Sequence, residues 1–253
     1  MLPTEQTRLF AGLTFRTETP RGAAQVLIER KTDQTDGLAV HLANAYTVAL
    51  TMQDREYGAL FRNAECIFAD GKPISWLSQI AGPPLHQVRG PSLFRQVIDD
   101  GRDAGLRHFL LGASESTLSR LKANILREYP GVEIVGSWNP PFRELTAAER
   151  EWQDDQILCS GADVVWVGLG TPKQDFEVER LASQLPVVAV AIGAAFDFVA
   201  GTKREAPAWM TRSGTEWIFR LATEPRRLWR RYLVGNLLFL YAAAAHPNWK
   251  TRA

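Results

Sequence analysis

The chain has 253 residues, of which 45% are hydrophobic, and its formal net charge at pH 7 is +1. This length is sufficient for one α/β domain with a full core, and the near-neutral charge argues against a nucleic-acid partner. The charge is unevenly distributed, because eight basic and three acidic residues lie between Lys203 and Arg231. That basic segment indicates an anionic partner or an anionic surface.

Six short apolar runs are expected to form strands that are covered on both faces. They are residues 37–43, 65–70, 108–113, 133–138, 162–170 and 187–198. Helix-compatible segments lie between them, at residues 46–63, 91–104, 116–129, 147–160 and 174–184. This alternation predicts an α/β fold with a doubly wound, mostly parallel sheet, whose ligands bind beyond the carboxyl ends of the strands.

The C-terminal part of the chain differs in character, because glycine and proline interrupt a run of charged residues after the sixth apolar run. We predict that residues 1–200 form an α/β catalytic domain and that residues 201–253 form a basic, aromatic helical appendage. Pro225 is expected to break this appendage into separate helices, since proline cannot continue the hydrogen bonding of the preceding helix.

Several features predict a cytoplasmic protein without a membrane-spanning helix. Cys66 and Cys159 lack a CxxC partner, which is typical of reduced thiols. The first residues lack the basic start and long apolar stretch of a signal peptide. The longest apolar run, residues 237–245, or 233–245 if Gly235 and Asn236 are tolerated, is shorter than the roughly 20 residues that cross a bilayer.

Asp70 is the first candidate for catalysis, because it ends the second apolar run and is followed by Gly71. A carboxylate at a strand end that faces a cleft can take a proton from a substrate hydroxyl. The alternative is a turn-forming Asp-Gly pair with no catalytic function.

A second candidate follows the fifth run, where Gly168 and Gly170 precede a helix that Lys173 and Gln174 open. Glycines let the backbone approach a phosphate, and a helix N-terminus and a lysine favour its negative charge. Gly112, which ends the third run, is a further candidate at a strand end. The pattern is neither GxGxxG nor a Walker A loop, so a strand–helix turn with a surface lysine is the alternative.

The sixth run contributes a third candidate, in which Gly193 leaves space at a strand end and Phe196 and Asp197 follow. These residues are candidates for binding a nucleotide, since a carboxylate can accept hydrogen bonds from a base or a ribose. Asp197 could instead satisfy local backbone donors.

The fourth candidate is the arginine-rich tail, in which Arg220, Arg226, Arg227, Arg230 and Arg231 alternate with tryptophan, leucine and tyrosine. Arginine forks suit diphosphates, and aromatic side chains beside basic ones suit a lipid headgroup zone. A solvated charged face or a homo-oligomer contact is the alternative. The four histidines lack metal-ligand spacing and no Asp-x-Asp triplet occurs, so neither a metal nor a cofactor is expected.

Taken together, these stretches resemble the WecG/TagA/CpsF glycosyltransferase family. The matching segments are NAYTVAL (44–50), ADG (69–71), FLLGAS (109–114), VGLGTPKQD (167–175), GAAFDFVAG (193–201) and EWIFRLATEPRRLWRRYL (216–233). The resemblance implies a Rossmann-like, inverting, metal-independent enzyme that moves a sugar from a UDP-sugar to a polyprenyl-diphosphate-linked acceptor. It also implies a place in bacterial cell-surface polysaccharide biosynthesis and a peripheral location on the inner face of the cytoplasmic membrane.

The resemblance further implies roles for individual residues. Asp70 matches the family's proposed catalytic base, and Asn44 and Thr47 match polar positions that line the same pocket. Gln174 matches a sugar-nucleotide contact. The arginines that match diphosphate-binding positions are Arg220, Arg227 and Arg230.

The resulting expectation is that Asp70 deprotonates the acceptor hydroxyl while arginines and the helix N-terminus near Lys173 stabilise the departing UDP. The chain departs from the family's usual residues at Pro73, Ser92 and Glu205. Two other classes stay open: a dinucleotide-dependent oxidoreductase, which would need GxGxxG followed by an acidic residue, and a non-catalytic membrane adaptor. The donor sugar, the acceptor glycan and the oligomeric state are left open.

Overall fold

The computed structural model describes residues 6–33, 36–80, 82–245 and 251–252. The chain divides into two compact units, each assembled from separate stretches of sequence. The first unit comprises Met1–Thr19, Leu42–Arg89 and Arg204–Ala253, and the second comprises Pro20–His41 and Gly90–Lys203. The predicted division into residues 1–200 and 201–253 stays a prediction.

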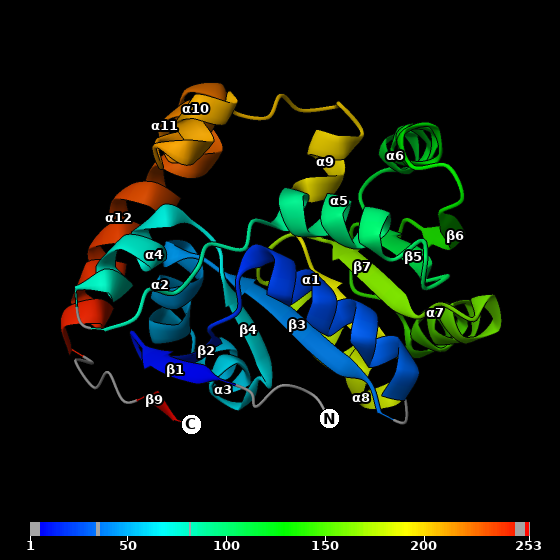
Figure 1. The fold of residues 1–253 in the computed structure, drawn as a ribbon, viewed down its shortest axis with the longest axis horizontal. Coiled ribbons are helices and arrows are strands. Elements are labelled where there is room, and N and C mark those ends of the chain that lie inside the picture. Colours follow the sequence, from blue (N-terminus) through cyan, green and yellow to red (C-terminus); the bar gives the residue numbers. More distant parts are fainter. Residues whose placement is uncertain (1–5, 34–35, 81, 246–250, 253) are drawn as a thin grey trace. The chain divides into compact units, whose positions relative to one another are not determined.

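The main sheet has six strands in the order β4-β3-β8-β7-β5-β6 (Figure 1). β3 pairs with β8, β8 with β7, β7 with β5 and β5 with β6, and each of these pairs is parallel. The strands are β3 (Leu38–Ala43), β4 (Cys66–Ala69), β5 (Arg107–Gly112), β6 (Glu133–Trp138), β7 (Val164–Gly168) and β8 (Val188–Ala191). A parallel sheet with intervening helices confirms the predicted α/β class.

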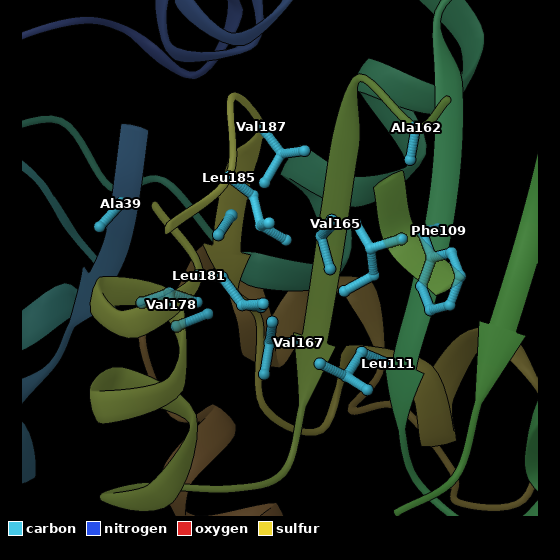
Figure 2. Packing of buried hydrophobic residues seen from close by; sticks show 13 residues of the cluster. Ala39, Phe109, Leu111, Ala162, Val165, Val167, Val178, Leu181, Leu185 and Val187 are labelled. Atoms are coloured by element: carbon cyan, nitrogen blue, oxygen red, sulfur yellow. The ribbon is translucent and has the colours of Figure 1, made fainter. Parts of the chain in front are cut away.

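The core of the second unit includes side chains of β7 and of a helix that follows it (Figure 2). Val165 and Val167 of β7 share a cluster with Val178 and Leu181, and all four are fully buried. Each such side chain contributes roughly 1.5–3 kcal/mol by leaving water. The helices of this unit are α1 (Pro20–Glu29), η1 (Arg30–Asp33), α5 (Gly90–Asp100), α6 (Glu115–Glu128), α7 (Ala147–Ser160), α8 (Lys173–Gln184) and α9 (Ala195–Val199).

The opposite face of β7 is also covered, as its continuous apolar sequence predicts. The indole N–H of Trp166 donates to Nδ1 of His108 at 3.1 Å. The ring of Phe94 meets the same indole edge-on, with 4.9 Å between ring centroids. A strand with two buried faces leaves its polar neighbours at its ends, which is where the candidate residues of the second unit lie.

The first unit contains an N-terminal hairpin, β1 (Thr7–Phe10) and β2 (Leu13–Arg16), that the sequence did not reveal because each strand has four residues. Ala11 and Gly12 have φ values of +48° and +82°, as a two-residue hairpin turn requires. A further strand, β9 (Thr251–Arg252), pairs with β1. The helices are α2 (Ala45–Gln53), α3 (Arg55–Asn63), α4 (Lys72–Gln79), α10 (Ala208–Arg212), α11 (Glu216–Thr223) and α12 (Pro225–Ala245).

α12 runs beside α2 (Figure 1) and is held by one buried stripe of side chains. Leu228, Phe239 and Ala242 are at most 2% exposed, and the rings of Phe239 and Phe10 lie 6.3 Å apart. A Cβ added at Gly235 would lie 3.4 Å from Tyr46, so a larger residue would crowd this contact. Within the part of the chain that the structure describes, no helix has the length and apolar composition to cross a bilayer.

Two predicted elements are wrong in their extent. Residues 46–63 form two helices, because the side chain of Asp54 accepts hydrogen bonds from Glu56 N–H and Tyr57 N–H and thereby caps α3. The apolar run 187–198 is a strand only within β8, since Gly193 adopts a φ of +57° and α9 then begins. Continuous apolar sequence does not distinguish a buried strand from a buried helix.

Candidate functional site

Asp70 lies directly after β4, as predicted. The four residues of β4 are buried, and Asp70 N–H donates to the carbonyl of Ala43 at 2.8 Å. Gly71 then takes a φ of +98°, a value that glycine adopts without steric cost, and α4 begins at the next residue. The backbone therefore turns sharply at Asp70 and leaves its carboxyl group at the carboxyl end of a strand.

Asn44 and Thr47 start α2 with a reciprocal pair of hydrogen bonds. The side-chain oxygen of Asn44 accepts from Tyr46 N–H at 3.0 Å and from Thr47 N–H at 3.2 Å. The hydroxyl oxygen of Thr47 accepts from Asn44 N–H at 3.2 Å. Both side chains thus have a structural function as a capping box, and their predicted role in catalysis stays a prediction.

Charged groups from distant parts of the first unit act on Asp70. The pKa of the Asp70 carboxyl group is raised to about 6. Burial is the largest cause and the negative charge of Glu216 adds to it, while Arg89, Arg220 and Arg231 oppose the rise. A carboxyl group with this pKa is ionised at neutral pH and is basic enough to accept a proton. We call these five residues the Asp70 cluster.

Arg89 is the centre of an ion-pair network in this cluster. Its Nε lies 3.0 Å from Oε2 of Glu216, and its Nη2 lies 3.2 Å from Oε1 of Glu216 and 3.0 Å from Oε1 of Glu205. Two parallel bonds to one carboxylate fix the orientation of the guanidinium group. Because Glu216 is the first residue of α11, this network also fixes the start of the helix that carries Arg220.

Sequence reasoning did not select Arg89 or Glu216 for the site, and it named Arg231 only as one of the tail arginines. The guanidinium group of Arg231 lies over the ring of Tyr46, 4.0 Å from its centroid, and so reaches α2 from α12. An ion pair between residues 127 positions apart has no local sequence pattern, and only the charge of each residue could have signalled it.

The predicted diphosphate-binding arginines are in different situations. Arg220 belongs to the Asp70 cluster. Arg230 is exposed, and its guanidinium group lies 5.2 Å from the ring centroid of Trp229. The backbone of Arg227 is part of α12, and its side chain lies outside the described part of the chain.

In the second unit, a turn formed by residues 168–174, here the glycine turn, connects β7 to α8. Gly170 N–H donates to the side-chain oxygen of Gln174 at 3.1 Å, and Gln174 N–H donates to the Gly170 carbonyl at 3.0 Å. Gln174 is 5% exposed, and a Cβ at Gly193 would lie 3.7 Å from its amide atoms. Gln174 thus lies between two strand-end turns, as a ligand-positioning side chain would.

Close backbone approaches explain why glycines occupy this region. A Cβ added at Gly112, where φ is +111°, would lie 2.8 Å from the backbone of Gly168. A Cβ added at Gly168 would lie 2.6 Å from the ring of Phe196, which is itself buried. Gly170 adopts a φ of +79°, and no atom lies within 4 Å of a Cβ built there.

Two charged residues flank these turns. Lys173 is exposed at the first position of α8. A positive charge interacts unfavourably with the helix dipole at this end, so the charge of Lys173 suits an external anion. The carboxylate of Asp197 accepts from the Thr202 hydroxyl at 3.1 Å and lies 3.0 Å from Nζ of Lys203. These partners are side chains and not the local backbone donors foreseen as the alternative, and the nucleotide contact of Asp197 stays a prediction.

Comparison with known proteins gives consistent results. The family model described as "Glycosyl transferase WecG/TagA/CpsF family" matches residues 8–253. A Bacillus spizizenii protein named N-acetylglucosaminyldiphosphoundecaprenol N-acetyl-beta-D-mannosaminyltransferase is 32% identical over 224 residues, covering 86% of this chain and 85% of that protein. A Bacillus subtilis protein of the same name is 27% identical over 221 residues, covering 87% of this chain and 84% of that protein.

Proposed function

Since the chain belongs to the WecG/TagA/CpsF family of glycosyltransferases, we propose that it transfers a sugar from a UDP-sugar to a polyprenyl-diphosphate-linked N-acetylglucosamine acceptor. The acceptor follows the names of the two relatives, which also point to N-acetylmannosamine as the sugar. The observation that carries the proposal is the Asp70 cluster, in which a carboxyl group with a pKa of about 6 lies in the field of three arginines.

The proposed step is a single inverting displacement. Asp70 accepts the proton of the acceptor hydroxyl as that oxygen forms a bond to the anomeric carbon of the donor sugar. The bond from the anomeric carbon to the UDP oxygen breaks at the same time, and UDP leaves with its negative charge. The proton on Asp70 then passes to solvent, which returns the carboxylate to its starting state.

The donor is proposed to bind at the glycine turn. Backbone N–H groups at the start of α8, a 12-residue helix, favour a diphosphate, and Lys173 adds a positive charge. Gln174 would contact the sugar nucleotide, and Gly112, Gly168 and Gly193 would leave room for it. The reaction is proposed to need neither metal nor cofactor, with Lys173 and the start of α8 stabilising the charge on UDP.

We further propose that the enzyme docks on the inner face of the cytoplasmic membrane through α10 to α12. Large apolar side chains on these helices are exposed, which suits insertion among lipid headgroups. They are Trp209, Trp217, Ile218, Trp229, Leu233, Val234, Leu237, Leu240 and Tyr241. Arg226 and Arg230 lie on the same segment and are exposed, so they would attract anionic lipids.

The test of the catalytic assignment is Asp70→Asn, assayed with UDP-N-acetylmannosamine and a short-chain diphosphate-linked N-acetylglucosamine acceptor. We expect turnover to fall by about 10²–10⁴-fold, because the amide cannot accept the proton, while thermal stabilisation by UDP is retained. Asp103→Asn, at an exposed position, is the matched control. Near-full turnover by Asp70→Asn would exclude Asp70 as the base, and stabilisation by NAD in place of UDP would favour an oxidoreductase.

A further inference from the structure

A fully buried histidine in the second unit has a carboxylate at each ring nitrogen. His41 lies on β3 and is 0% exposed. Its Nδ1 is 3.2 Å from Oδ1 of Asp175, and its Nε2 is 2.8 Å from Oε1 of Glu179. Both carboxylates come from the first two turns of α8, so a single ring connects the sheet to this helix.

The geometry is that of an imidazolium ion. A neutral imidazole has one donor and one acceptor nitrogen, so only the protonated ring can donate to both carboxylates. Asp175 and Glu179 are four positions apart on one helix, where like charges repel, and a cation between them removes that repulsion. β8, the neighbouring strand paired with β3 in this unit, brings only valine and alanine.

The environment also acts on the ionisation of His41. Burial alone would lower the pKa of this ring, but the hydrogen bonds and charges of Asp175 and Glu179 outweigh burial, and the pKa is raised above its usual value. The positive charge is therefore lost only as the pH rises through the raised pKa. Below that pH the bridge between β3 and α8 is intact.

The first turn of α8, which Asp175 connects to His41, also supports the glycine turn. Asp175 N–H donates to the Pro172 carbonyl at 3.0 Å, and the next residue toward the N-terminus is Gln174, whose side-chain oxygen accepts from Gly170 N–H. Asp175 is 2% exposed and has little freedom to move independently. A change at His41 is therefore transmitted to Gln174 through one residue.

We propose that His41 is a positioning residue of the donor site, whose imidazolium holds the first turn of α8 and thereby keeps the glycine turn in the shape that binds UDP. UDP affinity then depends on pH through His41, although His41 does not touch the ligand. This inference rests on the proposed donor site at the glycine turn.

The first test measures UDP affinity of the full chain by calorimetry between about pH 6 and pH 9. We expect the dissociation constant of the wild type to rise about tenfold with pH, because charge-assisted hydrogen bonds are lost. His41→Asn should bind UDP weakly at every pH. The ratio of the two proteins' dissociation constants at each pH cancels the effect of the ionisation of UDP itself. A wild type and a variant with the same pH dependence would overturn the proposal.

Glu179→Gln gives a test that does not depend on the folding of His41→Asn. The Glu179 side chain is 37% exposed, so its replacement by the isosteric amide is expected to be tolerated. Removing this charge should lower the pKa of His41 and move the fall in UDP affinity to lower pH. Glu151→Gln, an exposed change of the same charge on α7, should leave the profile in place, and an unmoved profile in Glu179→Gln would contradict the proposal.

A nuclear magnetic resonance titration separates this inference from the proposed function. The Gly170 amide signal should shift with the same midpoint as the His41 ring, whereas burial lowers the pKa of His108 to about 4 and keeps that ring neutral. A Gly170 signal that ignores His41 would overturn the coupling whether or not UDP binds. A coupled Gly170 signal in a wild type that binds no UDP would support the His41 bridge and count against the donor site.

Discussion

The two candidate regions of this enzyme consist of different chemical groups. The Asp70 cluster consists of charged side chains brought together from positions 70, 89, 216, 220 and 231. The region around the glycine turn consists mainly of backbone, with close approaches at Gly112 and Gly168 and one hydrogen-bonded amide side chain. The first region should respond chiefly to charge and pH, and the second chiefly to the size of the residue at each glycine.

This difference follows from what each region is proposed to do. A base must hold a proton for part of the cycle, so its pKa has to be set by neighbouring charges. A nucleotide diphosphate is already charged and needs N–H donors at a fixed distance, which a closely packed backbone provides. Variants that enlarge a glycine should therefore act mainly on the region around the glycine turn, and variants that remove a charge should act mainly on the Asp70 cluster.

The largest effect is expected for Gly112→Ala in the backbone-built region. A Cβ at this position would lie 2.8 Å from the backbone of Gly168, which neither strand can avoid, and the φ of +111° is unfavourable for alanine. We expect the free energy of unfolding, measured in urea, to fall by about 3 kcal/mol. UDP affinity should fall as well.

Gly131→Ala is the control for the backbone conformation alone. Gly131 has a φ of +86°, yet a Cβ there would meet nothing within 4 Å. Its expected cost is about 1 kcal/mol. Equal losses of stability in Gly112→Ala and Gly131→Ala would show that the close approach to Gly168 is unimportant.

An intermediate effect is expected for charge changes in the Asp70 cluster. Because the base must be ionised, wild-type activity should fall as the pH drops through the Asp70 pKa of about 6. Arg89 lowers this pKa and Glu216 raises it, so Arg89→Met should move the acid limb of the activity profile upward and Glu216→Gln should move it downward. Each displacement should be roughly 0.5–1 pH unit.

Glu56→Gln serves as the control for these profiles, since Glu56 is exposed on α3. Its acid limb should coincide with that of the wild type. If Arg89→Met and Glu216→Gln moved the acid limb in the same direction, the opposite charges of Arg89 and Glu216 would not be what sets the pKa of Asp70.

The smallest effect is expected for Arg230→Gln, which tests whether all tail arginines act alike. Arg230 is exposed beside Trp229, so we expect it to contribute mainly to binding of vesicles that contain anionic lipid, weakened about fivefold in the variant. Activity toward a short-chain, water-soluble acceptor should change little. Arg127→Gln, at an exposed position of α6, should bind the vesicles normally, and a large loss of soluble-acceptor activity in Arg230→Gln would assign Arg230 to the active site instead.

Sequence reasoning succeeded where the determinants are local. The alternation of apolar runs and helices predicted the parallel sheet, and the position of Asp70 after an apolar run predicted its place at a strand end. The glycines before Lys173 likewise predicted a tight turn at a helix start. Each of these depends on residues within a few positions of one another, so the pattern contains the information.

The remaining features depend on contacts between distant segments. The ion pair of Arg89 with Glu216, the packing of Arg231 on Tyr46 and the carboxylates on either side of His41 could not be read from spacing. In the sequence, His41 is only one of four histidines that lack metal-ligand spacing. Its two carboxylate partners became visible only once β3 and α8 were placed side by side.

The first unit is assembled from separate stretches of the chain, and this affects how it folds during synthesis. The hairpin residue Phe10 packs on Phe239, so the hairpin has to wait for α12 to leave the ribosome. At about 5–20 residues per second this delay is on the order of 10–50 s, during which aromatic side chains that end up buried stay exposed to other nascent chains. A requirement for a chaperone during translation is therefore to be expected for this unit, while the second unit can complete its core before the chain is finished.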